Sequence, residues 1–318
     1  MKIAIIIFFI LLHYCGYNQG AFAPPAGQFG STAIHKDSTA IVHWAESCEV
    51  IRGGLDIADS TLGLVTFGSE EDAIDIADGA VVSLGDKGSA VLHFNGILFD
   101  GPGHDFAVFE NSFSDDFLEL AFVEVSSDGI NFVRFPATCD LQDSLQIGPF
   151  GSSDATHVNN LAGKYRAQFG TPFDLSELAG HPDLDINEIS HIRIIDCIGS
   201  LQPEFASHDQ YGRRINDPYP SPFSSGGFDL DAVGIIHYNA YTGLSENDLV
   251  FSVFPNPTTE LININCKGFI KAEIQTMQGR LIHSRKSNPI NCTSLANGNY
   301  IIKVLTENGI HIQIFMKR

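Results

Sequence analysis

Apolar positions between residues 24 and 240 follow a period of two, and helical spacing is scarce. β-Branched and aromatic residues fill these short runs, and Gly, Asn and Asp separate them. Because successive side chains of a strand point to opposite faces, the pattern predicts strands with one buried face. The expected strands lie at 81–84, 90–94, 105–110, 117–126, 131–135, 189–198 and 227–236.

The predicted strands 117–126 and 131–135 are expected to form a hairpin. Asp128-Gly129 is expected to turn strand 117–126 back into 131–135, since only a residue tolerant of positive φ fits there cheaply. The string Val123-Glu-Val-Ser-Ser-Asp-Gly-Ile-Asn-Phe132 resembles a hairpin common in discoidin-like and other galactose-binding-like jelly rolls. The resemblance implies a jelly-roll, galactose-binding-like β-sandwich over residues 24–240, a length that suits one such domain.

A second all-β unit is expected over residues 249–318. Residues 251–258 read Phe-Ser-Val-Phe-Pro-Asn-Pro-Thr, and two prolines this close cannot sit inside a helix or a paired central strand. The segment therefore marks the start of a second domain, which follows a predicted linker at 241–248. Short alternating runs follow, among them Leu261–Asn265, and Gly and Asn separate them.

This ordered set resembles the type A C-terminal sorting domain of the type IX secretion system of Bacteroidota. The matching stretches are Phe254-Pro-Asn-Pro257, Gly279-Arg280, Leu295, Gly298-Asn-Tyr-Ile-Ile-Lys303 and Phe315-Met-Lys-Arg318. Met277 departs from the family, which usually has an acidic residue there. The resemblance implies recognition by the type IX machinery, passage across the outer membrane and removal of the domain.

The N-terminus is typical of a signal peptide. Lys2 precedes an apolar run from Ile3 to Leu12, too short to cross a bilayer as a helix. We therefore predict a signal peptide at 1–23, no transmembrane segment in the mature protein, and a secreted or cell-surface location reached through the periplasm. On this oxidising route Cys266 and Cys292 could pair.

Charge is distributed unevenly along the chain. The formal net charge is −20, yet residues 249–318 carry 8 Lys/Arg against 3 Asp/Glu, and residues 1–248 carry 10 against 35. Phosphate binding depends on Lys and Arg, so the acidic body argues against nucleic acid as a partner. It favours cations and neutral ligands.

Asp229 and Asp231, in the last predicted strand of the body, are the strongest candidates for metal ligands. At i and i+2 they are expected on one face, opposite Phe228, Leu230 and Ala232. Carboxylate oxygens are the ligands that Ca²⁺ prefers. The pattern predicts a calcium site; the alternative is that both carboxylates point into water or meet Arg. The other expected ligands are Asp105, Glu110 and Asn111.

A ligand site is expected in the irregular segment 199–227, which is rich in Pro, Asp, Asn and Ser. A loop this long in a compact domain is usually functional or disordered. Its aromatic and basic residues predict a binding surface. The candidate ligand-binding residues are Tyr211, Arg213, Tyr219 and Phe223.

Three classes of function stay open for the body. Together the body segments Ser83-Leu-Gly85, Asp105 to Asn111, the hairpin Glu124 to Phe132, Asn216-Asp-Pro218 and Phe228 to Gly234 resemble an uncharacterised extracellular domain of bacterial surface proteins. Related surface proteins in the same phylum are tied to cobalamin capture. The leading hypothesis is a binding module for a neutral ligand, either a glycan or a cobalamin-like cofactor. A secreted polysaccharide-active enzyme and a purely structural or adhesive protein are the alternatives. Gly-x-Ser-x-Gly and His-Glu-x-x-His are both missing from the sequence, so no catalytic residue is assigned.

Overall fold

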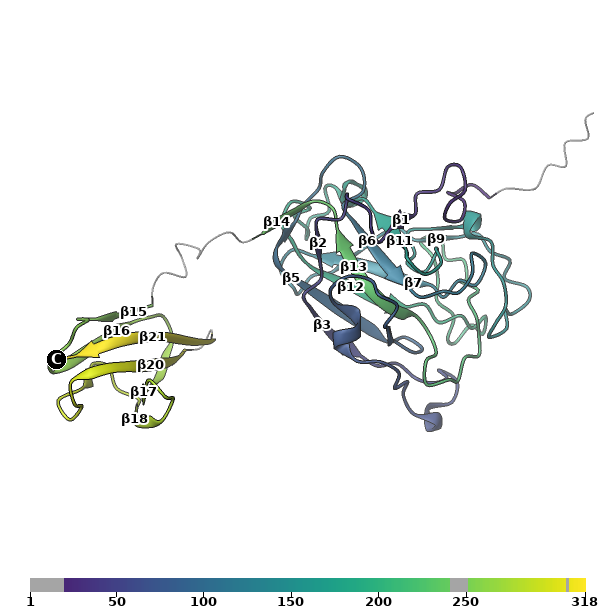
Figure 1. Cartoon of the computed structure of the whole chain (residues 1–318). Helices are drawn as coiled ribbons and strands as arrows, with labels where there is room; N and C mark the ends of the chain where they lie inside the picture. The colour runs from purple at the N-terminus through teal and green to yellow at the C-terminus, as the bar shows by residue number, and fades with distance from the viewer. Residues whose placement is uncertain (1–19, 241–250, 307–308) are drawn as a thin grey trace, which may run out of the picture. The chain divides into compact units, whose positions relative to one another are not determined.

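A computed structural model describes residues 20–240, 251–306 and 309–318 of the chain (Figure 1). Contacts divide the chain into two compact units, Met1–Ala240, here called the body, and Tyr241–Arg318, the C-terminal unit. The predicted linker at 241–248 and most of the predicted signal peptide, residues 1–19, lie outside the described residues.

The body is an all-β sandwich, as the period of two predicts. Each of its two main sheets has six strands, and every strand pairing within them is antiparallel. The first runs in the order β1 (Ile34–His35), β11 (Phe169–Phe173), β6 (Phe106–Glu110), β13 (Asp229–Ile235) and β2 (His43–Trp44), with β4 (Val82–Ser83) also paired to β13. The second runs in the order β14 (Tyr238–Ala240), β5 (Ser89–Leu98), β12 (Ile189–Asp196), β7 (Ala121–Ser126) and β8 (Val133–Arg134), with β3 (Ser47–Ile51) also paired to β5.

Smaller elements complete the body. Two short strands, β9 (Thr138–Cys139) and β10 (Val158–Asn159), pair with each other. The 3-10 turns are η1 (Ser60–Leu62), η2 (Glu70–Ala73), η3 (Ala155–His157) and η4 (Leu175–Leu178).

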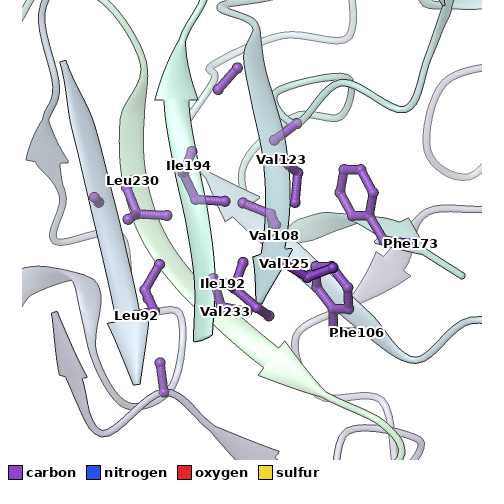
Figure 2. Packing of buried hydrophobic residues seen from close by; sticks show 14 of the residues in the cluster. Leu92, Phe106, Val108, Val123, Val125, Phe173, Ile192, Ile194, Leu230 and Val233 are labelled. Carbon is purple, nitrogen blue, oxygen red and sulfur yellow. The ribbon is translucent and has the colours of Figure 1, made fainter. Parts of the chain in front are cut away.

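The core lies between the two main sheets. In β5 and β12 buried and half-buried positions largely alternate, so one face of each strand points inward. One cluster of buried side chains draws members from both sheets, as Figure 2 shows. They include Leu92, Val123 and Ile192 from the second sheet and Phe106, Val108 and Leu230 from the first.

Strands β6 and β13 are buried on both faces rather than on one. Every residue of both strands is buried. A second apolar cluster covers their outer side, where Trp44, from β2, packs with Phe109 and Ala232. Acidic side chains on these strands are therefore enclosed by protein.

The expected hairpin is present between β7 and β8. Gly129 has φ of 73°, and the Asp128 carboxylate accepts hydrogen bonds from the backbone N–H groups of Ile130 and Asn131. The predicted strand 117–126 is shorter than expected. It begins at Ala121, because Leu118 and Leu120 pack into a separate apolar cluster.

The C-terminal unit is also all-β and has its own apolar core, which includes Ile262, Ile274 and Phe315. A three-stranded sheet runs in the order β15 (Ser252–Phe254), β16 (Leu261–Asn265) and β19 (Ile290–Asn291). A four-stranded sheet runs in the order β18 (Leu281–Arg285), β17 (Phe269–Thr276), β20 (Gly298–Thr306) and β21 (Gly309–Lys317). Cys266 and Cys292, which could pair on an oxidising route, are both free thiols in this structure. Among the described residues of the chain, no helix is long and apolar enough to span a membrane.

Replacing Phe106 with Ala is expected to lower the free energy of unfolding of the body by about 3–5 kcal/mol, because it leaves a cavity among packed rings. Its ring centroid lies 5.2 Å from that of Phe173 and 5.8 Å from that of Phe135. Urea denaturation measures the change. Phe29→Ala is the matched control, since this side chain is fully exposed. Equal stability losses in the two variants would contradict the assigned core.

Candidate functional site

A cleft of about 250 Å³ opens beside the N-terminal end of β13. Four segments form its walls: the loop after β6, the segment that leads into β7, the loop between β9 and η3, and the loop that precedes β13. We call it the acidic cleft. Its lining residues are Asn111, Ser112, Phe113, Phe117, Glu119, Pro149, Phe150, Ser221, Phe223, Ser225, Gly226 and Asp229.

Two pairs of stacked phenyl rings line the acidic cleft. Phe113 stacks on Phe117 with ring centroids 4.5 Å apart and an interplanar angle of 22°. Phe150 stacks on Phe223 at 5.7 Å and 26°. Phe113 and Phe150 are exposed over 73% and 71% of their surface. Phe117 is buried beneath Phe113, whereas Phe223 is exposed like its partner Phe150. Exposed rings beside polar groups are characteristic of ligand sites.

Carboxylates from distant parts of the chain meet at this cleft. Glu119 and Asp229 line it, and Asp229 accepts a hydrogen bond from the Ser83 hydroxyl. Three further carboxylates near them are almost completely buried and interact electrostatically with them or with one another. We call the five together the acidic cluster: Glu110, Glu119, Asp196, Asp217 and Asp229.

Burial and mutual repulsion disfavour the charged forms of the cluster. Burial raises the pKa of Asp229 to about 6. The pKa values of Glu110 and Asp217 are raised well above the ordinary range, first by burial and then in part by the negative charges of neighbouring acids. The pKa values of Glu119 and Asp196 are raised for the same two reasons.

The structure brings three of the five expected calcium ligands together and separates the other two. Glu110, Asn111 and Asp229 all belong to the cleft or to the acidic cluster behind it. Asp231 instead accepts hydrogen bonds from the backbone N–H groups of the loop at 78–79. It is only 3% exposed, and Asp229 only 7%, so the alternative that both point into water is wrong.

Asp105 belongs to a different acidic group, with Asp100 and Asp174. Their carboxylate oxygens lie within 4.8 Å of one another, and among the described residues this is the one group of three or more such side chains so closely spaced. Both oxygens of Asp105 are occupied: they accept from the Gly101 N–H at 2.8 Å, the Leu175 N–H at 2.6 Å and His237 Nδ1 at 2.6 Å. Asp105 therefore ties the loop before β6 to neighbouring segments.

The four expected ligand-binding residues do not share one surface. Only Phe223 lines the acidic cleft. The Tyr219 hydroxyl donates to Asp56 Oδ1 at 2.6 Å and its ring is buried. Arg213 forms ion pairs with Asp209 and Asp140 beside the exposed ring of Tyr211.

Three larger hollows, of about 460, 760 and 560 Å³, lie elsewhere on the body. In the first, Arg134 is paired with Glu124. In the second, Arg214 is paired with Asp143, and Asp56 accepts the hydrogen bond from Tyr219. Arg134, Arg214 and Asp56 are thus engaged within the protein, although Lys87, Glu204 and His208 of the first hollow take part in none of the ion pairs of the described residues. The two carboxylates that line the acidic cleft, Glu119 and Asp229, have no basic partner among those ion pairs either.

Sequence reasoning missed several residues of the site. Phe113 and Phe150 lie in loops without a strand pattern, and Asp217 lies inside the long irregular segment. Glu119 lies in the apolar run 117–126 that was predicted to be a strand, and nothing in that run marks it as part of a site. The excess of Asp and Glu in the body was the one sequence feature that indicated an acidic site. Composition does not show which of these side chains lie close together in the fold.

Stability of the body is expected to fall as pH rises from about 5 to 7 in the presence of a chelator. For Asp229 the folded pKa, about 6, exceeds the unfolded value of 3.8, so the folded state keeps a proton that the unfolded state has lost. At a pH below both pKa values the carboxyl group is protonated in the folded and the unfolded state, so it no longer destabilises the folded state. Asp229→Asn is expected to flatten the decline by about 1–3 kcal/mol, measured by urea denaturation at both pH values.

The control for this measurement is Asp128→Asn. The pKa of Asp128 is lowered by hydrogen bonds from Ile130 and Asn131, and this exposed carboxylate is ionised at both pH values. Its removal should leave the slope between pH 5 and 7 unchanged. An unaltered slope in Asp229→Asn would contradict the buried, protonatable state assigned to this carboxyl group.

Two solved structures show a remote likeness to the chain. One is titled "Biofilm associated protein - BSP domain", with 9% identity, 88% of this chain and 53% of that chain covered, and a TM-score of 0.20. Another is the β-glucuronidase of Parabacteroides merdae with glycerol in its active site, with 10% identity, 94% and 36% covered, and a TM-score of 0.22. The chain thus spans about half the length of the first and about a third of the second. No curated protein matches the chain.

The C-terminal unit does match a known family. Residues 252–318 match the family described as "Secretion system C-terminal sorting domain". The matched region starts at the first residue of β15 and contains all the strands of the C-terminal unit. The predicted resemblance is confirmed, and with it the secreted or cell-surface location. Residues 252–318 are the type IX secretion C-terminal sorting domain of a secreted or cell-surface protein.

Proposed function

We propose that the body of this exported protein binds a neutral carbohydrate in the acidic cleft. The observation that carries the proposal is the combination of two stacked phenyl pairs with the Glu119 and Asp229 carboxylates in one cleft without a Lys, Arg or His in its lining. The apolar face of a sugar ring packs on an aromatic ring, and its hydroxyl groups donate hydrogen bonds to carboxylates.

Charge and size narrow the class of ligand. The raised pKa values show how costly further negative charge would be near Glu119 and Asp229, so anionic sugars are disfavoured. A volume of about 250 Å³ is slightly below the range of about 300–1,000 Å³ typical of small-molecule pockets. It suits one or two sugar rings better than a cobalamin-like cofactor.

A polysaccharide-active enzyme is the second candidate. Glu119 and Asp229 line the same cleft, and both carboxyl groups have raised pKa values, as a general acid requires. Turnover of an oligosaccharide that is lost in Glu119→Gln would favour the enzyme over the binding module. Binding without turnover would favour the module.

Phe150→Ala is expected to weaken carbohydrate binding by about tenfold, because an exposed stacked ring contributes about 0.5–1.5 kcal/mol beyond its buried area. The measurement is a glycan array followed by isothermal titration with the neutral oligosaccharides that bind. Phe29→Ala is the matched control, since Phe29 is exposed but does not line the acidic cleft. Equal losses in both variants, or no neutral glycan bound by the wild-type protein, would overturn the proposal.

Deletion of residues 252–318 is expected to leave the body inside the cells of a host that has a type IX system, because the sorting domain is the part that the machinery recognises. Immunoblots of periplasm, cell surface and culture medium measure the distribution. Phe106→Ala in the full chain controls for loss through misfolding. A truncated body that still reaches the surface or the medium would contradict this role of the tail.

A further inference from the structure

The first described residues of the chain are held against a distant part of the body. The Gly20 N–H donates a hydrogen bond to the Thr156 hydroxyl at 3.0 Å, and the Phe22 N–H donates to the Thr156 carbonyl at 3.0 Å. Thr156 belongs to η3 and is only 4% exposed. We call residues 20–26 the N-terminal strap, and its first half is thus fixed on η3.

Phe22 covers a buried lysine. Lys164 is only 4% exposed, and its Nζ donates to the Val158 carbonyl at 2.7 Å. The ammonium lies 5.9 Å from the centroid of the Phe22 ring and 5.6 Å from that of Tyr165, within the range of cation–π contacts. Among the ion pairs of the described residues, none involves Lys164. Without Phe22, this ammonium would lose one of the two rings that lie against it.

The second half of the N-terminal strap supports a wall of the acidic cleft. Ala26 is buried, and its carbonyl accepts a hydrogen bond from Arg166 Nη1 at 3.0 Å. The same nitrogen donates to Asp115 Oδ1 at 2.5 Å. Asp115 lies in the loop after β6, which also carries Phe113 of the cleft. Arg166 therefore connects the strap to this loop.

The chain stays on the body between the N-terminal strap and its first strand. The Thr32 hydroxyl forms a hydrogen bond of 2.8 Å with the hydroxyl of Tyr165, which is only 1% exposed, and β1 then pairs with β11. Three consecutive residues, Lys164, Tyr165 and Arg166, thus each contact the N-terminal segment. From residue 20 onward, this segment is part of the folded domain.

Sequence alone places the end of the signal peptide inside the N-terminal strap. Signal peptides are removed at small residues in an A-x-A-like pattern, which Ala21-Phe22-Ala23 fits. The bond after Ala23 leads into Pro24, so it is a tertiary amide without an N–H. A cut there would remove both hydrogen bonds to Thr156 and the ring over Lys164.

We propose that the signal peptide is cut on the N-terminal side of Phe22, and that Phe22 and the rest of the N-terminal strap belong to the mature body. Small residues are available for such a cut at Gly16, Gly20 and Ala21. A leader that is removed contributes nothing to the stability of the exported protein. Phe22, in contrast, donates a backbone hydrogen bond to the body and covers a buried ammonium.

The direct test is N-terminal sequencing of the full-length gene product, recovered from the surface or the medium of a host that has a type IX system. We expect a first residue that lies after the apolar run 3–12 and no later than Phe22. A mature chain that begins at Ala23 or later, or one that still carries the apolar run, would overturn the proposal. This result does not depend on whether the body binds carbohydrate.

The second test measures what the strap contributes. In a chain of residues 20–318, Phe22→Ala is expected to lower the Tm of the body by about 2–4 °C, the shift that follows from losing one cation–π contact in a domain of this size. Lys164 should also react faster with acetic anhydride, as followed by peptide mass spectrometry. Phe29→Ala is the matched control, since this nearby ring is fully exposed. Equal Tm values and equal acetylation of Lys164 in the two variants would contradict a structural role for Phe22 in the mature body.

Discussion

Strand β13 is the constraint on which the rest of the body depends, because it is buried along its whole length and yet carries two aspartates. It pairs with β6, β2 and β4 in the first sheet, and its Leu230 and Val233 side chains enter the core between the sheets. Removing such a strand from water stabilises the sandwich through apolar burial. The same burial makes each of its carboxylates expensive unless it is hydrogen-bonded or neutralised.

The two aspartates differ in the hydrogen bonds that compensate for the burial of their carboxylates. Asp231 is matched by two backbone N–H groups from the loop at 78–79, so its role is to fix that loop over the sheet. Asp229 receives only the Ser83 hydroxyl and lies near other acids. Two residues of one strand therefore have different surroundings: Asp231 is a structural acceptor, and Asp229 lines a cleft open to solvent.

The acidic cleft depends on loops that long-range pairing brings together. Glu110 ends β6, and its neighbour across the sheet is Leu230, next to Asp229. The loop after β6 carries Phe113, and the loop before β13 carries Phe223. Rigid paired strands thus hold the carboxylates, whereas the aromatic rings stand on loops, as is common for recognition sites on β-sandwiches. Export by the sorting domain brings the body, and this cleft with it, to the cell surface or the medium.

Local features of the sequence were sufficient to predict the fold class and the secreted or cell-surface location of the protein. The period of two in apolar residues depends only on neighbours along the chain, and it predicted the β class of both units. In the body it predicted β4, β5, β6, β7, β8, β12 and β13 but none of the other strands, most of which are too short to show a period. The sorting domain was identified from ordered stretches such as Phe254-Pro-Asn-Pro257, which are also local. The turn at Asp128-Gly129 follows from the conformational freedom of one glycine.

Only the tertiary structure decided which carboxylates are neighbours. Glu110, Asp217 and Asp229 approach one another because β6 pairs with β13 and because an irregular loop folds back on both, and neither event leaves a periodic signal. The i, i+2 spacing of Asp229 and Asp231 indicated a shared face, but the ladder shifts register between Leu230 and Ala232 and a different loop reaches each carboxylate. Spacing along a strand determines to which face of the sheet a side chain points. The groups that contact a buried carboxylate depend instead on the loops and strands that pack over that face.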